Sequence, residues 1–234
     1  MYNKKKVSII LPAYNEEENI KAAVEDFFST GVVDEIIVVD NNSKDNTAKE
    51  VAKTKAKLVL ETKQGYGNAM QRGLKEASGD YILTAEPDGT FIGKDIKRLL
   101  LYTDDFDVVF GTRTSKESIW SGANMDWFLR VGNWFVAKLL EYTYNGPSLT
   151  DVGCSLKLIK RESLKKIEHK FEVGESHFSP EFMILCIKNG IKCVEIPVNY
   201  KERIGTSKIT GDFWKAFKLG LIMIGLIIKN RFRK

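Results

Sequence analysis

The chain has 234 residues, of which 43% are hydrophobic and 29% are charged, and this balance excludes a wholly disordered protein. Its length suffices for one sizeable α/β domain with a buried core. The formal net charge of +5 suits an anionic ligand or an anionic lipid surface. The basic residues cluster at the two ends without a stripe of base-stacking aromatic residues, so we expect no nucleic-acid partner.

Short β-branched segments alternate with helical segments through the first half of the chain. The expected strands cover residues 7–11, 35–40, 57–60, 81–84 and 107–111. Helical periodicity marks residues 16–29, 47–54, 67–77 and 94–101. This alternation predicts an α/β fold with a Rossmann-like, mostly parallel sheet and helices on both faces.

The second half has a different character, with long amphipathic stretches over residues 124–144 and 212–229. A short βαβ-like passage lies between them, with a helix start at Ser179-Pro180-Glu181 and a strand over residues 192–198. We expect one catalytic domain over residues 1–211, with an amphipathic helical insertion at about 120–145, and a terminal amphipathic helix over residues 212–234. The first residues lead directly into a strand, so no secretory leader is expected.

Polar residues follow the ends of several predicted strands, where a parallel sheet builds its ligand sites. They form the segments Pro12-Ala-Tyr-Asn-Glu16, Asp40-Asn-Asn-Ser43, Glu86-Pro-Asp88-Gly89 and Gly111-Thr-Arg113. Neither a Gly-x-Gly-x-x-Gly nor a P-loop motif is present, which argues against a nicotinamide dehydrogenase or a P-loop enzyme.

A glycine-containing loop and the acidic loop each suggest a ligand site. Gly65 and Gly67 precede a predicted helix, and with Lys63 they could receive a phosphate at its N-terminus. A simple glycine turn explains the same residues equally well. The carboxylates of Glu86 and Asp88 suit a divalent cation that also binds a pyrophosphate.

One set of motifs consists of Val7-Ser-Ile-Ile-Leu-Pro-Ala-Tyr-Asn-Glu-Glu, Glu35-Ile-Ile-Val-Val-Asp-Asn-Asn-Ser, Gly65-Tyr-Gly-Asn-Ala, Ser78-Gly-Asp-Tyr-Ile and the acidic loop. Together these motifs resemble family-2 glycosyltransferases. A later set consists of Asp107-Val-Val-Phe-Gly-Thr-Arg, Asp151-Val-Gly-Cys-Ser-Leu-Lys and Val194-Glu-Ile-Pro-Val-Asn-Tyr-Lys-Glu-Arg-Ile-Gly-Thr-Ser-Lys. These later motifs look like the polyprenyl-phosphate (dolichol-phosphate) mannosyl- and glucosyltransferase branch.

The resemblance implies a GT-A fold, a nucleotide-sugar donor, and a divalent metal, Mg²⁺ or Mn²⁺. Carried over by position, the donor-binding residues would be Pro12, Tyr14, Glu16, Asp40, Lys63, Gly65, Arg203, Ser207 and Lys208. The metal ligands would be Asp88 and Glu86, which replaces the family's usual Asp, with Thr90 at the position of a third ligand. The catalytic residues would be Asp88 together with Arg113 and Arg130, which would face the acceptor phosphate.

The implied reaction is inverting sugar transfer, from a GDP-mannose or UDP-glucose type of donor, to a polyprenyl phosphate. A phosphate acceptor is already anionic at neutral pH and needs no general base. An alternative is a family-2 enzyme with a hydroxyl acceptor, for which Glu181 is the candidate base, although its place early in a helix favours a role at the helix dipole. A binding protein without activity is a third hypothesis.

Tryptophan placement predicts a membrane surface as a partner. Trp127 and Trp134 follow Trp120 at seven-residue spacing, and Trp214 opens the last helix. The apolar run over residues 219–228 is too short to span a bilayer and is followed by basic residues. We therefore expect an in-plane helix at the cytoplasmic face of a membrane. The alternative is that both amphipathic stretches are ordinary helices that pack in a protein core or at an oligomer interface. A second copy of this chain is therefore also a candidate partner.

Overall fold

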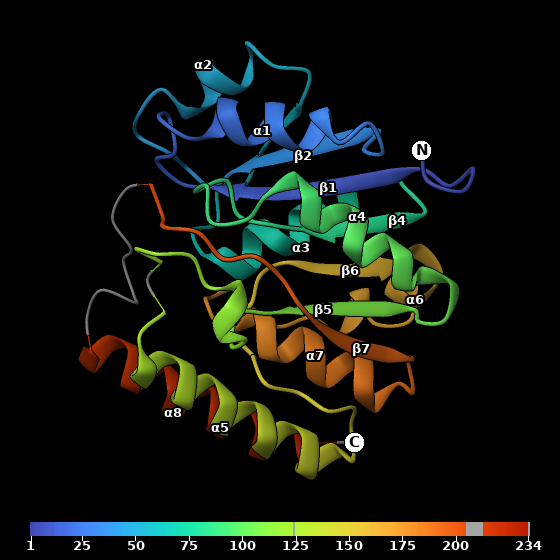
Figure 1. The fold of residues 1–234 in the computed structure, drawn as a ribbon, viewed down its shortest axis with the longest axis vertical. Coiled ribbons are helices and arrows are strands. Elements are labelled where there is room, and N and C mark those ends of the chain that lie inside the picture. Colours follow the sequence, from blue (N-terminus) through green and yellow to red (C-terminus); the bar gives the residue numbers. More distant parts are fainter. Residues whose placement is uncertain (124, 205–212, 234) are drawn as a thin grey trace.

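The computed structural model describes residues 1–123, 125–204 and 213–233, arranged as Figure 1 shows. Within them the strands are β1 (Val7–Ala13), β2 (Glu35–Asp40), β3 (Lys57–Leu60), β4 (Tyr81–Thr84), β5 (Val108–Thr112), β6 (Lys157–Lys160) and β7 (Cys193–Pro197). The α-helices are α1 (Ile20–Ser29), α2 (Thr47–Val51), α3 (Tyr66–Glu76), α4 (Gly93–Leu101), α5 (Trp127–Tyr144), α6 (Arg161–Lys165), α7 (Phe178–Lys188) and α8 (Phe213–Phe232). Short 3-10 helices cover Tyr102–Asp104, Lys116–Ser118 and Glu168–Lys170.

The strands form one mostly parallel sheet in the order β3-β2-β1-β4-β6-β5-β7. Strand β6 runs antiparallel to both of its neighbours, β4 and β5. The expected βαβ-like passage is present as β6, α6, α7 and β7, but its two strands are not neighbours and run in opposite directions, because β7 pairs in parallel with β5. The direction of β6 depends on the long connection through α5 that precedes it. The four residues of the strand do not themselves encode a direction. As a consequence, the residues that precede β6 lie at the edge where the parallel strands end.

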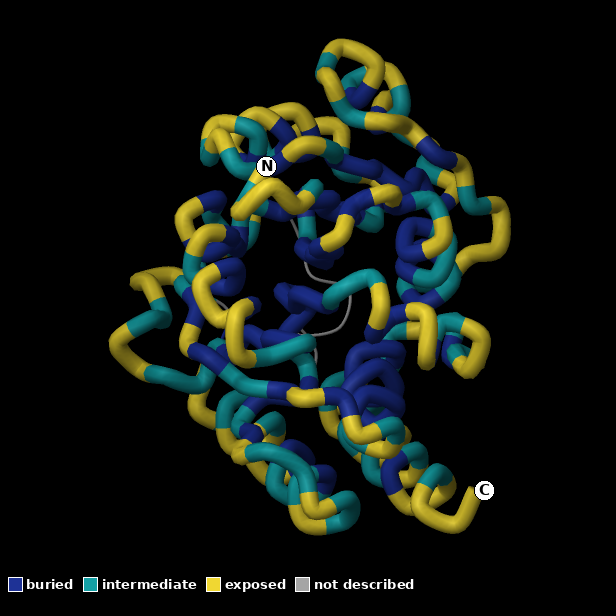
Figure 2. Tube along the Cα trace, turned by 90° about the vertical axis from the view of Figure 1, so that its right-hand side faces the viewer, coloured by how far each residue is buried: buried dark blue, intermediate teal, exposed yellow. Residues whose placement is uncertain are grey.

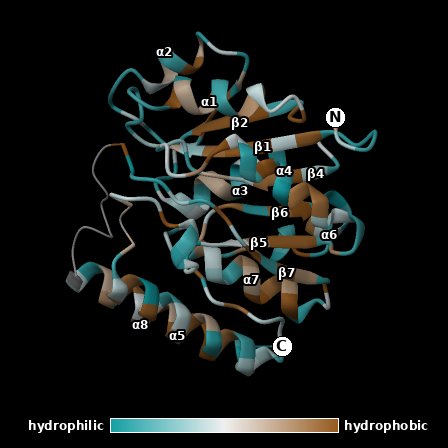
Figure 3. Ribbon diagram, viewed as in Figure 1, coloured by the Kyte–Doolittle hydropathy of each residue, from teal (hydrophilic) through white to brown (hydrophobic). Residues whose placement is uncertain are grey.

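Hydrophobic side chains alternate along the central strands and face two separate cores. Ile9 and Leu11 of β1 pack into a core with α1, α2 and α4, whereas Ile10 packs into a core with α3, α5, α7 and α8. Figure 2 shows the buried residues gathered in the middle of the molecule, and Figure 3 shows the hydrophobic colour concentrated in the strands. The expected sheet with helices on both faces is confirmed.

The helix that follows β1 begins later than predicted, at Ile20 instead of residue 16. The preceding backbone is held by the loop after β2, because the N–H groups of residues 15–17 donate to side-chain oxygens there. The acceptors are Ser43 Oγ at 3.0 Å, Thr47 Oγ1 at 2.9 Å and Asp45 Oδ2 at 3.1 Å. These contacts shape the strand end into a loop that can face a ligand.

Helices α5 and α8 pack against each other beside the sheet (Figure 1), and the Tyr144 hydroxyl donates to the carbonyl oxygen of Ile227 at 2.7 Å. Met223 and Ile227 of α8 are buried in the core that also contains α5 and α7. The two helices nevertheless share an exposed apolar face, which we define by Trp127, Trp134, Phe135, Trp214, Leu221 and Phe232.

Trp120 does not join this face, because it precedes α5 and its indole N–H donates to Asn199 Oδ1 at 3.1 Å. The expectation that Trp120 lies on one helix face with Trp127 and Trp134 is therefore wrong. Within the described residues, no helix is both long enough and apolar enough to cross a bilayer. The predicted boundary between residues 211 and 212 lies outside the described residues, so that domain division stays a prediction.

Candidate active site

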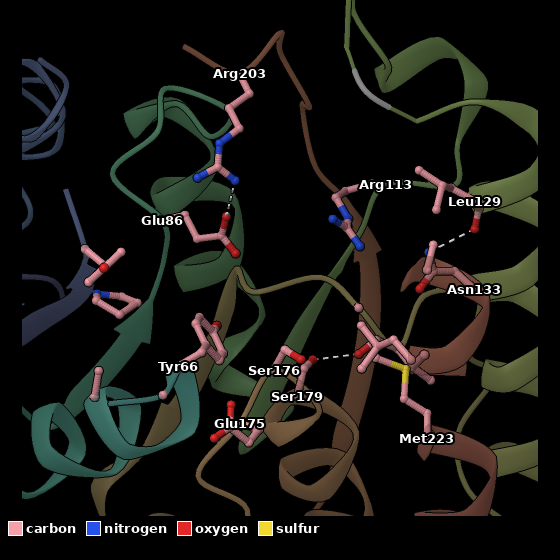
Figure 4. A pocket seen from close by; sticks show the side chains of 18 of the residues that line it. Tyr66, Glu86, Arg113, Leu129, Asn133, Glu175, Ser176, Ser179, Arg203 and Met223 are labelled. Atoms are coloured by element: carbon pink, nitrogen blue, oxygen red, sulfur yellow. Dashed lines mark hydrogen bonds and ion pairs between the residues drawn. The ribbon is translucent and has the colours of Figure 1, made fainter. Parts of the chain in front are cut away.

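A large cleft opens at the edge of the sheet where the parallel strands end, with a volume of about 1350 Å³. Its polar end is formed by the loops after β1, β2 and β4, and its apolar end by α5 and α8. Figure 4 shows Glu86 and Arg203 pointing toward each other, Arg113 beside them, and Leu129, Asn133 and Met223 on the helix side. The polar residues predicted at the strand ends and the two amphipathic helices thus line one cavity.

Five of the predicted donor-binding residues line the cleft: Pro12, Tyr14, Glu16, Gly65 and Arg203. Asp40 does not line the cleft; it is buried, and its Oδ1 accepts the N–H of Ser43 at 3.0 Å. The structure thus gives Asp40 the turn-forming contact typical of aspartate after a strand. Lys63 is exposed and also lies outside the cleft lining.

Asn41 organises the loops around the polar end. Its amide nitrogen donates to the carbonyl oxygens of Glu61 and Lys63 at 3.0 and 2.9 Å, and its Oδ1 accepts the N–H of Gly65 at 2.8 Å. One buried side chain therefore satisfies three backbone groups of the loop between β3 and α3. Sequence reasoning missed Asn41, although its place directly after β2 is the signal that would have found it.

The two glycines at the start of α3, Gly65 just before it and Gly67 in its first turn, serve close packing of another segment. Gly65 has a φ of 135°, and a Cβ there would lie 2.3 Å from the carbonyl oxygen of Gly174. A Cβ on Gly67 would lie 2.1 Å from the carbonyl oxygen of Val173. Gly65 does line the cleft, but its N–H is used by Asn41. The structure therefore favours the glycine-turn explanation over a phosphate cradle.

The acidic loop after β4 combines one buried and one partly exposed carboxylate. Asp88 is 1% exposed, and its Oδ1 accepts the N–H and the hydroxyl of Thr90 at 3.1 and 2.6 Å. Thr90 thus orients Asp88, and neither of these two predicted metal ligands lines the cleft. Burial of its carboxyl group and the neighbouring Asp88 raise the pKa of Glu86 to about 7.

This loop fits a hard divalent cation. Glu86 and Asp88 offer carboxylate oxygens, which Mg²⁺ and Mn²⁺ prefer. The buried Oδ2 of Asp88 accepts no hydrogen bond within the described residues, although it lies 3.1 Å from Arg203 Nη1. No group of three His, Cys, Asp or Glu side chains in the described residues could hold a metal ion alone. That is expected for a cation that completes its shell with phosphate and water.

Arg203, just before the undescribed residues 205–212, lies among the carboxylates of the polar end. Its Nη1 lies 3.1 Å from Asp88 Oδ2 and 4.0 Å from Glu86 Oε2, and its Nη2 donates to Glu16 Oε1 at 3.3 Å. Burial is the main cause that raises the pKa of Glu16. Arg203 lines the cleft as predicted, whereas Ser207 and Lys208 lie outside the described residues.

Arg113 is fixed beside the centre of the cleft. Its Nε and Nη2 donate to the two carboxylate oxygens of Asp151 at 2.8 and 3.0 Å, and its guanidinium lies 5.1 Å from the ring centroid of Tyr200. Burial opposes the charge of Arg113, but Asp151 outweighs this effect and raises the pKa of the guanidinium. Arg130 is on α5 but does not line the cleft, so the structure brings only the first of the two predicted arginines to the site.

Asp151 reaches this position because it precedes the antiparallel strand β6. It is itself held by Glu195 of β7, whose carboxylate accepts the N–H groups of Thr150 and Asp151 at 2.7 and 3.0 Å. Burial raises the pKa of Glu195 to about 7. A chain of contacts from β7 through the loop before β6 therefore sets the orientation of Arg113.

The apolar end of the cleft is lined by residues of both amphipathic helices. Phe128, Val131, Phe135 and Val136 come from α5, and Phe217, Leu221, Met223 and Ile224 come from α8. Gly132 and Gly220 also line it, and a Cβ on either would meet no atom within 4 Å. This end therefore has room for a hydrocarbon group.

Comparison with known sequences decides the family. Residues 8–168 match the family described as Glycosyl transferase family 2. The chain belongs to this family. The glycosyltransferase is 31% identical over 229 residues to an uncharacterized protein of Methanocaldococcus jannaschii, covering 93% of this chain and 92% of that protein. It is 29% identical over 221 residues to an uncharacterized glycosyltransferase of Mycobacterium tuberculosis, covering 89% of this chain and 96% of that one.

Solved structures show the same fold as the glycosyltransferase. Glucosyl-3-phosphoglycerate synthase from Mycobacterium tuberculosis, in complex with Mn²⁺, UDP and glucosyl-3-phosphoglycerate, has a TM-score of 0.72 at 18% identity, covering 97% of this chain and 80% of that one. The same enzyme with Mg²⁺ and UDP has a TM-score of 0.70, also at 18% identity, with coverage of 97% and 79%. The expected GT-A fold class is confirmed.

In the glycosyltransferase, two acidic residues near the start of α7, Glu181 and Glu175, differ in whether they line the cleft. Glu181 is buried outside the cleft lining, and its oxygens accept the N–H groups of Glu172 and Val173, each at 3.0 Å. It therefore fixes a loop and is not positioned as a base. Glu175, which sequence reasoning missed, is exposed and lines the cleft (Figure 4). Its place just before a helix start was the available signal.

Proposed function

We propose that this glycosyltransferase transfers a sugar, with inversion, from a nucleoside-diphosphate sugar to the phosphate of a polyprenyl lipid. The observation that carries this proposal is the continuity of the cleft, which joins polar strand-end loops to an apolar end lined by α5 and α8. A diphosphate fits the first environment, and a hydrocarbon chain fits the second.

The donor would occupy the polar end. Pro12 and Tyr14 would flank the nucleoside, and Glu86 and Asp88 would hold a divalent cation. When bound, such a cation supplies charge neutralisation for the diphosphate that leaves. The solved complexes of glucosyl-3-phosphoglycerate synthase contain UDP with Mn²⁺ or Mg²⁺, which supports this assignment of the donor end.

The acceptor phosphate would lie at Arg113, between the two ends of the cleft. A phosphate monoester is largely an anion at neutral pH, so it needs orientation and partial neutralisation and no proton removal. Because Asp151 holds it by two hydrogen bonds, the guanidinium is pre-oriented for this role. An acceptor phosphate oxygen would bond to the anomeric carbon as the bond from that carbon to the diphosphate oxygen breaks. The bonding electrons leave with the nucleoside diphosphate.

We further propose that the enzyme works at the cytoplasmic face of a membrane. The exposed apolar face of α5 and α8 lies on the same two helices that line the apolar end of the cleft. Tryptophan favours the headgroup level of a bilayer, and Lys229 and Arg231 in the last turn of α8 suit anionic headgroups. A lipid acceptor could then enter the cleft without leaving the bilayer surface.

A hydroxyl acceptor is the second candidate function, because Glu175 lines the cleft. Its carboxylate would remove the acceptor's proton, a step that a phosphate acceptor does not require. In this case Glu175→Gln would abolish transfer. If the acceptor is a lipid phosphate, the same variant should keep its rate within about two-fold.

The first experiment is transfer of radiolabelled sugar from GDP- and UDP-sugars to a short polyprenyl phosphate, with Mg²⁺ or Mn²⁺. A labelled product that partitions into chloroform supports the proposal and identifies the donor. Label transferred only to a soluble hydroxyl acceptor contradicts it.

The apolar end can be tested separately by filling it. Gly132→Leu and Gly220→Leu add side chains where a Cβ meets no atom within 4 Å, so the helices should form normally. Gly225→Leu is the matched control on α8, because its Cβ is equally free and Gly225 does not line the cleft. We expect the first two variants to lose transfer to the polyprenyl phosphate while retaining slow donor hydrolysis. Equal activity of all three variants would argue against lipid binding at the apolar end.

A further inference from the structure

Arg203 has an unusual environment, because its guanidinium faces three carboxylates at one end of the cleft. They belong to Glu16 at 3.3 Å, Asp88 at 3.1 Å and Glu86 at 4.0 Å. These carboxylates come from the loops after β1 and β4, whereas Arg203 follows β7. The arginine therefore supplies positive charge at the same place where the acidic loop fits a divalent cation.

The arginine is only partly satisfied there. Asp88 Oδ2 and Arg203 Nε are buried, and neither has a hydrogen-bond partner within the described residues. The ion pair between Arg203 and Asp88 therefore lacks the alignment of a good hydrogen bond, and its partners keep unused bonding capacity. The side chain of Arg203 is still 28% exposed, so it has a free path into the cleft.

The backbone around Arg203 is anchored, in contrast to this loosely satisfied side chain. The N–H of Lys201 donates to Thr90 O at 2.9 Å, and the N–H of Ile204 donates to Asp88 O at 3.0 Å. Asn19 Nδ2 donates to Ile204 O at 3.1 Å. Rotation of the side chain alone can therefore move the guanidinium between the carboxylates and the space of the cleft.

We propose that Arg203 is an internal counter-cation that couples metal binding to donor binding. Without a ligand, its guanidinium neutralises Glu16, Glu86 and Asp88 and competes with a divalent cation for the two carboxylates of the acidic loop, Glu86 and Asp88. When the nucleoside diphosphate is present, the guanidinium moves onto the diphosphate oxygens and leaves the carboxylates to the cation. The competition is thereby removed, and each ligand strengthens the binding of the other. This inference rests on the proposed nucleoside-diphosphate donor and is independent of the acceptor.

The test compares Mn²⁺ binding by the purified full chain and by Arg203→Gln, each with and without UDP or GDP, by electron paramagnetic resonance titration. Without nucleotide, we expect the variant to bind Mn²⁺ at least about 10-fold more tightly than the wild type, because the competing charge is gone. Saturating nucleotide should tighten Mn²⁺ binding in the wild type by a larger factor than in the variant.

Two further variants separate this role from a general effect of charge or of folding. Arg72→Gln removes one positive charge from an exposed ion pair with Glu76 on α3, and its Mn²⁺ affinity should equal that of the wild type. Arg203→Lys keeps the charge on a different head group, so its Mn²⁺ affinity should lie between those of the wild type and Arg203→Gln. If Arg203→Gln fails to fold, the Mn²⁺ affinity of Arg203→Lys tests the proposal in its place.

The sign of the change decides the outcome. A purely structural role of Arg203 predicts unchanged or weaker Mn²⁺ binding in Arg203→Gln, because the acidic loop would lose a support. That result, or an unchanged effect of nucleotide, would overturn the proposal while leaving the glycosyltransferase assignment intact. Absence of Mn²⁺ binding in every protein, even with nucleotide, would also overturn it and would remove the metal from the proposed function. Neither result depends on whether a lipid is the acceptor.

Discussion

The two ends of the cleft are built in different ways. At the polar end, side chains follow the ends of β1, β2 and β4, and short loops hold them through contacts such as those of Asn41. At the apolar end, α5 and α8 are about 70 residues apart in the chain and meet only in the folded protein. The polar end is thus made from local loops on a rigid sheet, whereas the apolar end depends on the packing of two distant helices.

This difference separates two kinds of effect. A change at the polar end should alter catalysis and leave the fold intact, because the sheet below is complete without it. A change at the junction of the two ends, where buried charges hold the loops together, should alter stability as well. A change on the part of the exposed apolar face that lies outside the cleft should affect only association with a membrane. The following predictions run from the largest expected effect to the smallest.

Asp88→Asn should reduce sugar transfer by about 10²- to 10³-fold, because it removes a charged group from the site where negative charge develops. The remaining Oδ1 can still accept from Thr90, so the melting temperature should change little. Asp105→Asn, at an exposed position, is the control. A steady-state transfer assay combined with thermal unfolding checks both expectations. Full activity of Asp88→Asn in excess chelator would rule out the metal role.

Asp151→Asn should destabilise the fold by about 3–5 kcal/mol, because it leaves the buried Arg113 without its charge partner. The free energy of unfolding, from urea titration, measures this effect. Adding Arg113→Met to this variant removes the stranded charge and should restore part of the stability while activity stays low. If the single variant is as stable as the wild type, the ion pair does not hold the two ends of the cleft together.

Trp127→Ala should weaken binding to anionic vesicles by about 10-fold, since a buried aromatic side chain contributes about 1.5–3 kcal/mol. Trp127 is 73% exposed, so folding should be unaffected. Leu101→Ala is the matched control, because Leu101 is 66% exposed on α4, on the other face of the sheet. Co-sedimentation with vesicles measures the effect. An equal loss for both variants, or no loss for either, would count against the exposed apolar face as the membrane surface.

Glu195→Gln should change the pH dependence of stability, an effect that shows only when stability is compared across pH values. The pKa of Glu195 is raised to about 7 from an ordinary value of 4.5, so the folded protein binds more protons between these pH values. Through this group, the free energy of unfolding falls as pH rises from about 4.5 to 7. The variant should lose this contribution. The difference between the two stability curves over this range is the measurement, and parallel curves would contradict the prediction.

The sequence predicted the donor half of the fold well because its signals are local. Strands 35–40, 57–60 and 81–84 were predicted with their observed bounds, since each is a compact apolar run closed by polar residues. Strand β6 was not located, because its residues Lys157–Lys160 carry two lysines and show no clear period. Its antiparallel direction follows from a long connection that no local pattern describes.

The same division holds for the candidate site. Among the predicted site residues, Glu16, Glu86 and Arg113 line the cleft. Five others do not line it: Asp40, Lys63, Asp88, Thr90 and Arg130. Whether a side chain faces the cleft depends on its neighbours in space. Asp40 turns inward to cap its own loop, and Glu181 turns to a segment nine residues earlier.

The sequence by itself determined the family, the alternation of strands and helices, and the polar residues at the strand ends, because each is encoded within a few neighbouring residues. Tertiary structure alone decided the direction of β6, the pairing of Arg113 with Asp151, the three carboxylates around Arg203, and the apolar end of the cleft that α5 and α8 line together. Each of these joins residues that are distant in the chain. Their contacts form only when burial of the apolar faces of the sheet and helices brings them together.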